Sequence, residues 1–120
     1  SHDMLRTPEQ HAQAAKMAKQ LELTGLVIIG ATHSLTDAVS LSEYFLQNDV
    51  QTRVIAIPAT VDGNIKHKYI STSIGFDTAS KVYSQLIGNM LTDSASAIKY
   101  WYFIRLMGRD PSHLALECAM

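Results

Sequence analysis

The sequence contains little cysteine and no long apolar run. Cys118 is the single cysteine in 120 residues, which excludes an internal disulfide framework and favours a reducing compartment, by default the cytoplasm. No apolar run approaches the roughly 18 residues of a membrane-spanning helix, and no charged and apolar leader indicates secretion. The net charge of -1 gives no electrostatic reason to expect nucleic acid or a membrane as partner.

The composition is that of a folded globular protein, with 47% hydrophobic and 18% charged residues. The length suits one domain or a piece of one. Residues 1–4 have the character of a cloning remnant, since a methionine preceded by Ser-His is an unusual start. We expect residues 5–120 to be a fragment of an α/β domain, because three strands and a short last helix would leave the sheet edges open.

The apolar pattern predicts helices and strands in alternation. Helices are expected over residues 8–23 with Gly25 ending the first, from Ser34 to Asn48, from Gly75 over about four turns, and from Pro111 behind an Asp110 cap. Strands are expected over residues 26–29, 52–57 and 100–106. This order predicts a doubly wound parallel sheet with right-handed crossovers.

Three positions carry further packing predictions. Gly88 lies within the long predicted helix, where glycine costs about 1 kcal/mol against alanine, so a close neighbour is expected there. Trp101, between two tyrosines, is expected in the core or interface of the third strand rather than in a stacking platform. Cys118 lies on an apolar helical stretch and is expected to pack.

Each predicted strand is followed by a polar segment at its carboxyl end. These segments are residues 30–34, 58–64 and 107–110. In open α/β sheets, ligands bind in the crevice at the carboxyl ends of the strands. The sequence therefore predicts one ligand site to which all three segments contribute.

Several side chains in these segments fit phosphate and proton chemistry. Arg109 precedes a predicted helix start and could bind a phosphate, although it could also be a surface residue paired with Asp110. Asp62 could accept a proton from a substrate hydroxyl, or it could simply form a turn with Gly63. Thr60 could bind a phosphate or its own loop.

Other site types have weaker support. His33 could act as a ligand or acid/base group, but a lone histidine at a helix start is more often a satisfied polar residue. The five histidines show no HxxxH or HxH spacing, so a transition-metal site is not expected. A dinucleotide-binding domain is disfavoured because no G-x-G-x-x-G motif follows a strand.

Six segments of the chain form a recognisable succession: residues 26–30, 58–64, 74–79, 86–89, 103–109 and 112–118. Over about residues 24–120 this succession resembles the phosphofructokinase family, and most of all its long, pyrophosphate-dependent branch in plants and protists. It implies a three-layer, Rossmann-like fold. It also implies a 6-phosphofructo-1-kinase of glycolysis that converts fructose 6-phosphate to fructose 1,6-bisphosphate, with Mg²⁺ as cofactor in the parent enzyme, pyrophosphate or ATP as donor, and other phosphofructokinase subunits or a companion half as partners.

The resemblance implies roles for individual residues. Thr60 matches the loop threonine, and Asp62 matches the base that takes the proton from the 1-hydroxyl of the sugar. Met107, Gly108 and Arg109 match the motif that holds the sugar phosphate, and Arg109 also steadies the transferring phosphoryl group.

The departures from the family pattern concern the donor side. Gly30 and Ser34 keep their places in the donor motif and are expected to bind the phosphoryl donor, but Thr32 stands where active members have the magnesium-binding aspartate. Ala59 replaces a lysine, and Asn64 replaces a second aspartate.

This pattern resembles the non-catalytic α-type subunit of plant enzymes or the degenerate half of fused protist enzymes. We therefore expect no metal ligand in this stretch and no turnover by this stretch alone. The alternatives are a regulatory or structural module that binds a sugar phosphate, or an ATP-dependent phosphofructokinase.

Overall fold

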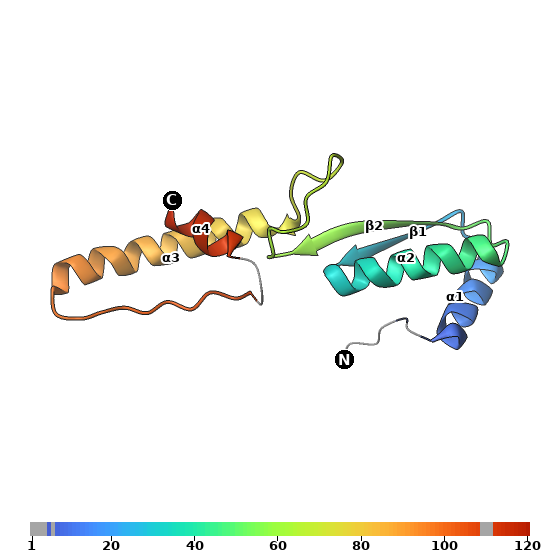
Figure 1. Cartoon of the computed structure of the whole chain (residues 1–120), viewed down its shortest axis with the longest axis horizontal. Helices are drawn as coiled ribbons and strands as arrows, with labels where there is room; N and C mark the ends of the chain where they lie inside the picture. The colour runs from blue at the N-terminus through green and yellow to red at the C-terminus, as the bar shows by residue number, and fades with distance from the viewer. Residues whose placement is uncertain (1–4, 6, 109–111) are drawn as a thin grey trace. The chain divides into compact units, whose positions relative to one another are not determined.

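The computed structural model describes residues 5, 7–108 and 112–120, which fall into two compact units, Ser1–Pro58 and Ala59–Met120. Each unit is described by itself. The elements, labelled in Figure 1, are α1 (Pro8–Gln20), β1 (Gly25–Gly30), α2 (Thr32–Gln47), β2 (Arg53–Thr60), β3 (Ile74–Gly75), α3 (Phe76–Ala97) and α4 (His113–Ala119). The prediction that residues 5–120 form part of one domain stays a prediction.

The strands form a parallel sheet in the order β1-β2-β3. β1 and β2 run in register from Gly25↔Arg53 to Gly30↔Pro58. At its carboxyl end β2 changes neighbour and pairs with β3 through Ala59↔Ile74 and Thr60↔Gly75. The predicted α/β class with a parallel sheet is confirmed, but β2 ends at Thr60 rather than residue 57.

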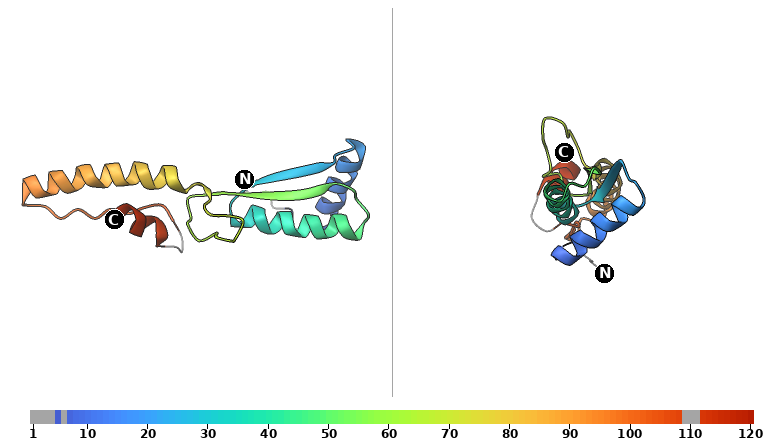
Figure 2. Two further views of the ribbon diagram at one scale, coloured as in Figure 1. Left: turned by 90° about the horizontal axis from the view of Figure 1, so that it is seen from above. Right: turned by 90° about the vertical axis from the view of Figure 1, so that its right-hand side faces the viewer.

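The core of the first unit lies between the helices and one face of β1 and β2. Leu41 and Phe45 of α2 are the largest fully buried side chains among the described residues, and α2 runs along the two strands in Figure 1 and in the left view of Figure 2. Ala15, Ala18 and Val50 complete the buried cluster. Burying a leucine or phenylalanine side chain contributes about 1.5–3 kcal/mol, so this helix face holds the unit together.

The first helix begins as its sequence predicts but ends earlier. Thr7 caps it, with the Oγ1 of Thr7 accepting the backbone N–H of Gln10 at 3.3 Å and the Gln10 side chain accepting the backbone N–H of Thr7 at 3.1 Å. The helix ends at Gln20, because Glu22 adopts a left-handed φ of 49° and its N–H bonds the carbonyl oxygen of Lys19. Gly25 is therefore the first residue of β1 and not a helix terminator.

The second helix begins earlier than predicted. Thr32 is its first residue and Ala31 its N-cap, without a side-chain cap, so Ser34 lies inside the first turn. The predicted end is confirmed: Asn48 is the C-cap, with its backbone N–H bonded to the carbonyl oxygen of Tyr44 at 3.1 Å. On this helix Ala38, Leu41 and Phe45 are buried, whereas Val39 is exposed.

The long helix α3 starts where the sequence predicts. Gly75 is its N-cap and takes a left-handed φ of 98°, a conformation that glycine adopts without strain. The prediction for Gly88 is wrong, because a Cβ atom added there meets no atom within 4 Å. Ser80 is the buried residue of α3 among the described residues, and the apolar positions Val82, Leu86 and Leu91 remain exposed.

The predicted third strand is wrong. Residues 100–106 form an extended segment without strand pairing, and the third strand is the short β3 instead. Side chains hold the segment beside α3 (Figure 1), where the Tyr102 hydroxyl donates to the Asp93 carboxylate at 2.8 Å. Trp101 and Phe103 are 92% and 96% exposed, so neither lies in a core or in an interface of the described chain.

The last helix packs against α3. Its described part begins at His113, with Ser112 as the N-cap, and the predicted cap at Asp110 and helix start at Pro111 lie outside the described residues. Cys118 is buried, and its thiol donates to the carbonyl oxygen of Ser80 at 3.6 Å. The predicted packing role of Cys118 is confirmed.

Candidate functional site

Thr60 and Asp62 lie together at the carboxyl end of β2. The Oγ1 of Thr60 accepts the backbone N–H of Asp62 at 3.1 Å, and both residues are half-buried. This bond fixes the turn in which the chain leaves the sheet. The Asp62 carboxylate is therefore held on an ordered turn rather than on a free loop, as a proton acceptor requires.

Gly63 fixes the other side of this turn. It is buried, and a Cβ atom at this position would lie 2.7 Å from the Cε2 of Phe76 and 3.0 Å from the Cβ of His113. The turn is thus packed against the first residues of both α3 and α4. Sequence reasoning missed Phe76 and His113, and its only signal for Gly63 was the Asp-Gly turn dipeptide.

Met107 and Gly108 contribute to a small pocket in the second unit. Its volume is about 320 Å³, and it is lined by Ile87, Ile104, Leu106, Met107, Gly108, Leu114 and Ala115. Gly108 takes a φ of 150°, while the Met107 side chain is 69% exposed. Arg109, which the sequence predicts to bind phosphate, lies outside the described residues.

The predicted donor residues lie together in the first unit. A Cβ atom at Gly30 would lie 2.5 Å from the Oγ and 2.6 Å from the Cβ of Ser34, so only glycine leaves room for that side chain. Thr32 is exposed in the first turn of α2, where its carbonyl oxygen accepts the Thr36 hydroxyl at 3.1 Å. His33, beside it, is also exposed. The donor role of Gly30 and Ser34 stays a prediction.

The start of α2 does not fit a magnesium ion. Its first turn offers hydroxyl groups and a histidine but no carboxylate, and hydroxyls do not supply the charge that holds Mg²⁺. The next carboxylate along the helix, Asp37, accepts the backbone N–H of Leu5 at 3.3 Å. Across the described part of the chain, no three His, Cys, Asp or Glu side chains gather closely enough to hold a metal.

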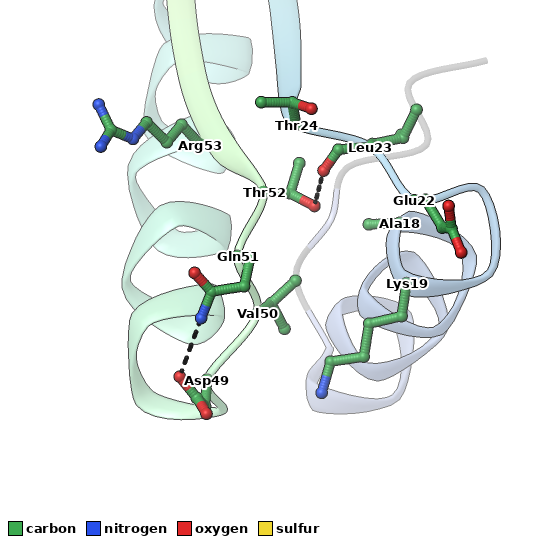
Figure 3. A pocket seen from close by; sticks show the side chains of 10 residues that line it. All are labelled: Ala18, Lys19, Glu22, Leu23, Thr24, Asp49, Val50, Gln51, Thr52 and Arg53. Carbon is green, nitrogen blue, oxygen red and sulfur yellow. Dashed lines mark hydrogen bonds between the residues drawn. The ribbon is translucent and has the colours of Figure 1, made fainter.

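Another pocket of the first unit lies away from these residues. It has a volume of about 670 Å³ and lies before the amino ends of β1 and β2 (Figure 3). Its wall includes two hydrogen bonds, from the Thr52 hydroxyl to the Leu23 carbonyl oxygen at 2.7 Å and from the Gln51 amide to Asp49 at 3.3 Å. Ligands of open α/β sheets bind at the carboxyl ends of the strands, whereas this pocket lies at the amino ends.

Within the described ranges no helix is long and apolar enough to cross a membrane.

Comparison with known proteins decides the family. A profile of the phosphofructokinase family matches residues 2–120. The chain belongs to the phosphofructokinase family. The resemblance carried by the sequence motifs is thereby confirmed, and the parallel sheet is that of a fragment of a Rossmann-like phosphofructokinase domain.

Curated relatives extend this assignment to the pyrophosphate-dependent branch. The β subunit of pyrophosphate–fructose 6-phosphate 1-phosphotransferase from Solanum tuberosum is 51% identical over 118 residues, which are 98% of this chain and 21% of that protein. The α subunit 2 from Arabidopsis thaliana is 48% identical over 98% of this chain and 19% of its own length. The enzyme of that name from Treponema pallidum is 48% identical over 97% of this chain and 20% of its own.

The chain spans about a fifth of the length of these relatives. Its identities to α and β subunits differ by three percentage points or less, for example 51% and 48%, and do not separate the two subunit types.

Proposed function

We propose that the full-length protein transfers a phosphoryl group from pyrophosphate to the 1-hydroxyl of fructose 6-phosphate. The observation that carries this proposal is the ordered turn of Thr60 and Asp62 at the end of β2, fixed by a 3.1 Å hydrogen bond. The names of its relatives support the same reaction with pyrophosphate, rather than ATP, as donor.

In the proposed reaction, Asp62 is the general base. Its carboxylate takes the proton of the 1-hydroxyl while that oxygen forms a bond to the nearer phosphorus of pyrophosphate, and the bridging P–O bond breaks to release orthophosphate. Thr60 positions the base through the backbone N–H of Asp62. A positioned base of this kind contributes about 10²- to 10⁴-fold to the rate.

The sugar phosphate is proposed to bind beside the pocket that contains Met107 and Gly108. Gly108 lets the backbone approach the ligand, and the guanidinium of Arg109 pairs with the phosphate in a bidentate way. An arginine here would also offset the negative charge that develops on the transferring phosphoryl group.

A second candidate function is a regulatory or structural module that binds the sugar phosphate without catalysis. The residues at the start of α2 favour it, since Thr32 supplies no charge where the family has its magnesium ligand. Ala59, in place of the family lysine, is half-buried in β2 and pairs with Ile74. In this case other phosphofructokinase subunits, or a companion half, would carry the chemistry. In either case we propose a cytoplasmic protein.

One experiment on the full-length protein separates the two functions. Asp62→Asn removes the base at nearly constant volume and is expected to lower pyrophosphate-dependent kcat by about 10²- to 10⁴-fold, with an unchanged KM for fructose 6-phosphate. Asp49→Asn is the matched control, because it removes an exposed carboxylate of the first unit and should leave kcat unchanged.

The converse variant restores what the family pattern has and this chain lacks. If this stretch hosts the reaction, Thr32→Asp combined with Ala59→Lys should raise pyrophosphate-dependent turnover. An unchanged kcat in that variant and in Asp62→Asn would leave the regulatory module as the function of this stretch.

A further inference from the structure

A cationic turn projects from the loop that follows Asp62. Lys66, His67 and Lys68 are consecutive and exposed, and no acidic residue occurs between Asp62 and Asp77. In a chain with a net charge of -1, this loop is a local concentration of positive charge. Two exposed lysines on a loop are common and by themselves indicate no binding site. The geometry of the turn decides whether these two can bind an anion together.

The turn is built as a rigid unit. His67 and Ile70 exchange two backbone hydrogen bonds, of 3.0 and 2.9 Å, which close a tight turn with Lys68 and Tyr69 at its tip. Lys-Tyr is not a favoured pair for a two-residue turn, where Asn-Gly and Asp-Gly prevail, so turn formation does not explain these residues. The pair is better explained by what its side chains do.

The ring of Tyr69 lies close to the side chains of Lys68 and His67. The ammonium group of Lys68 lies 4.7 Å from the centre of this ring, and the His67 ring lies 5.5 Å from it. A cation held over an aromatic face loses less side-chain freedom when it binds an anion. Among the described residues neither Lys66 nor Lys68 forms an ion pair with a carboxylate, so both ammonium groups are free for a ligand.

The turn lies close to Asp62 because the loop that carries it begins at the next residue. Gly63 is buried against Phe76 and His113, and Ser73 is 3% exposed beside β3, so both ends of the loop are anchored. Lys66 lies four positions after Asp62, which limits the distance between their Cα atoms to about 14 Å for any path of the chain. A lysine side chain at this range can bind a ligand that also reaches Asp62.

We propose that this turn binds the pyrophosphate of the phosphoryl donor through Lys66 and Lys68, with Tyr69 as the positioning residue. The inference rests on the proposed function, because that reaction supplies a diphosphate near Asp62. The two ammonium groups would offset the negative charge of the pyrophosphate. Ala59 of β2 cannot do this, because its side chain is neutral where the family has a lysine.

The test is direct binding of inorganic pyrophosphate to the full-length protein by calorimetry. The double variant Lys66→Gln/Lys68→Gln should weaken binding at least about tenfold and flatten its dependence on salt, since two charge-assisted contacts are lost. The control Lys16→Gln/Lys99→Gln removes the same charge from exposed positions elsewhere and should leave the affinity unchanged. Tyr69→Leu should weaken binding about two- to fivefold, while Tyr69→Phe keeps the ring and should restore it.

Binding of fructose 6-phosphate distinguishes the two possible sources of phosphate. It should be unchanged in the lysine double variant. Equal loss for both ligands, equal loss in the control, or no loss at all would overturn the proposal. Pyrophosphate binding is measured without turnover, so the two proposals can fail separately. If the full-length protein binds pyrophosphate but has no activity, the proposed reaction is refuted. If in that protein only the lysine double variant loses pyrophosphate binding, the inference about this turn still stands.

Discussion

Gly63 lies directly against His113, with only 3.0 Å between the place of a Cβ atom at position 63 and the Cβ of the histidine. His113 is the first residue of α4. The contact therefore joins the turn that carries Asp62 to the helix that follows the predicted sugar-phosphate motif. Because glycine has no side chain, two segments about fifty residues apart in the sequence can pack in direct contact at this point.

The first prediction is that Gly63→Ala disturbs both stability and activity. The new methyl group would meet the Phe76 ring at 2.7 Å, and overpacking of this kind costs about 1–3 kcal/mol. Denaturant unfolding measures the first effect, and a lower kcat measures the displacement of Asp62. Gly25→Ala is the control, because its Cβ would meet only the Arg53 carbonyl oxygen at 3.7 Å. Equal stability of the two variants would contradict the packing described here.

The second prediction concerns the hydrogen bond between Thr60 and Asp62. Thr60→Val keeps the shape of the side chain but removes the acceptor of the Asp62 N–H, and a hydrogen bond of this kind contributes about 0.5–1.5 kcal/mol. We expect kcat to fall by up to about tenfold. Thr60→Ser retains the acceptor and should stay close to the wild type. If serine and valine lowered kcat alike, the methyl group rather than the hydrogen bond would be what matters.

Local signals explain what the sequence could predict. The start of α3 was predictable because Gly75 can take a left-handed φ and a regular apolar repeat follows it. Asn48 was predictable as the end of α2 for a similar local reason. At the candidate site, the adjacency of Thr60 and Asp62 followed from their spacing in one turn.

Non-local contacts explain what the sequence could not predict. The end of the apolar run at Ile57 and the Gly63-Asn64 pair suggested a loop from Pro58 onward, yet β2 continues to Thr60 by changing its neighbour from β1 to β3. The aromatic segment at residues 100–106 has strand composition, but a strand also needs a partner, and here Tyr102 bonds a helix side chain instead. The burial of Gly63 depends on Phe76 and His113, which no periodicity connects to it.

The third prediction is that Gly88→Ala stabilises the chain. Gly88 lies within α3, and a Cβ atom there meets nothing within 4 Å, so alanine brings no clash. Alanine restricts the unfolded chain and favours the helix, which is expected to raise the free energy of unfolding by about 0.5–1 kcal/mol. Chemical denaturation checks the value. A loss of stability would show that a neighbour approaches this face of α3 after all.

The fourth prediction concerns the pH dependence of the contact between Tyr102 and Asp93. The hydrogen bond from the Tyr102 hydroxyl to the Asp93 carboxylate, together with burial and the nearby negative charge, raises the pKa of the phenol above its usual value of 10.0. The folded chain therefore keeps this proton at a pH where the unfolded chain releases it. The stabilisation is complete below the unfolded pKa, and it is lost as pH rises through the raised pKa of the folded state.

Tyrosinate absorbance measures this shift when the titration of Tyr102→Phe is subtracted from that of the wild type. The difference curve should have its midpoint above that of a free tyrosine. Asp93→Asn removes the negative charge and should bring the midpoint down, while Asp77→Asn should not, because Asp77 pairs with Lys81 at 2.9 Å and is not among the groups that act on this phenol. If the titration midpoint of Tyr102 were the same in the wild type and in Asp93→Asn, this hydrogen bond would not hold the extended segment to α3.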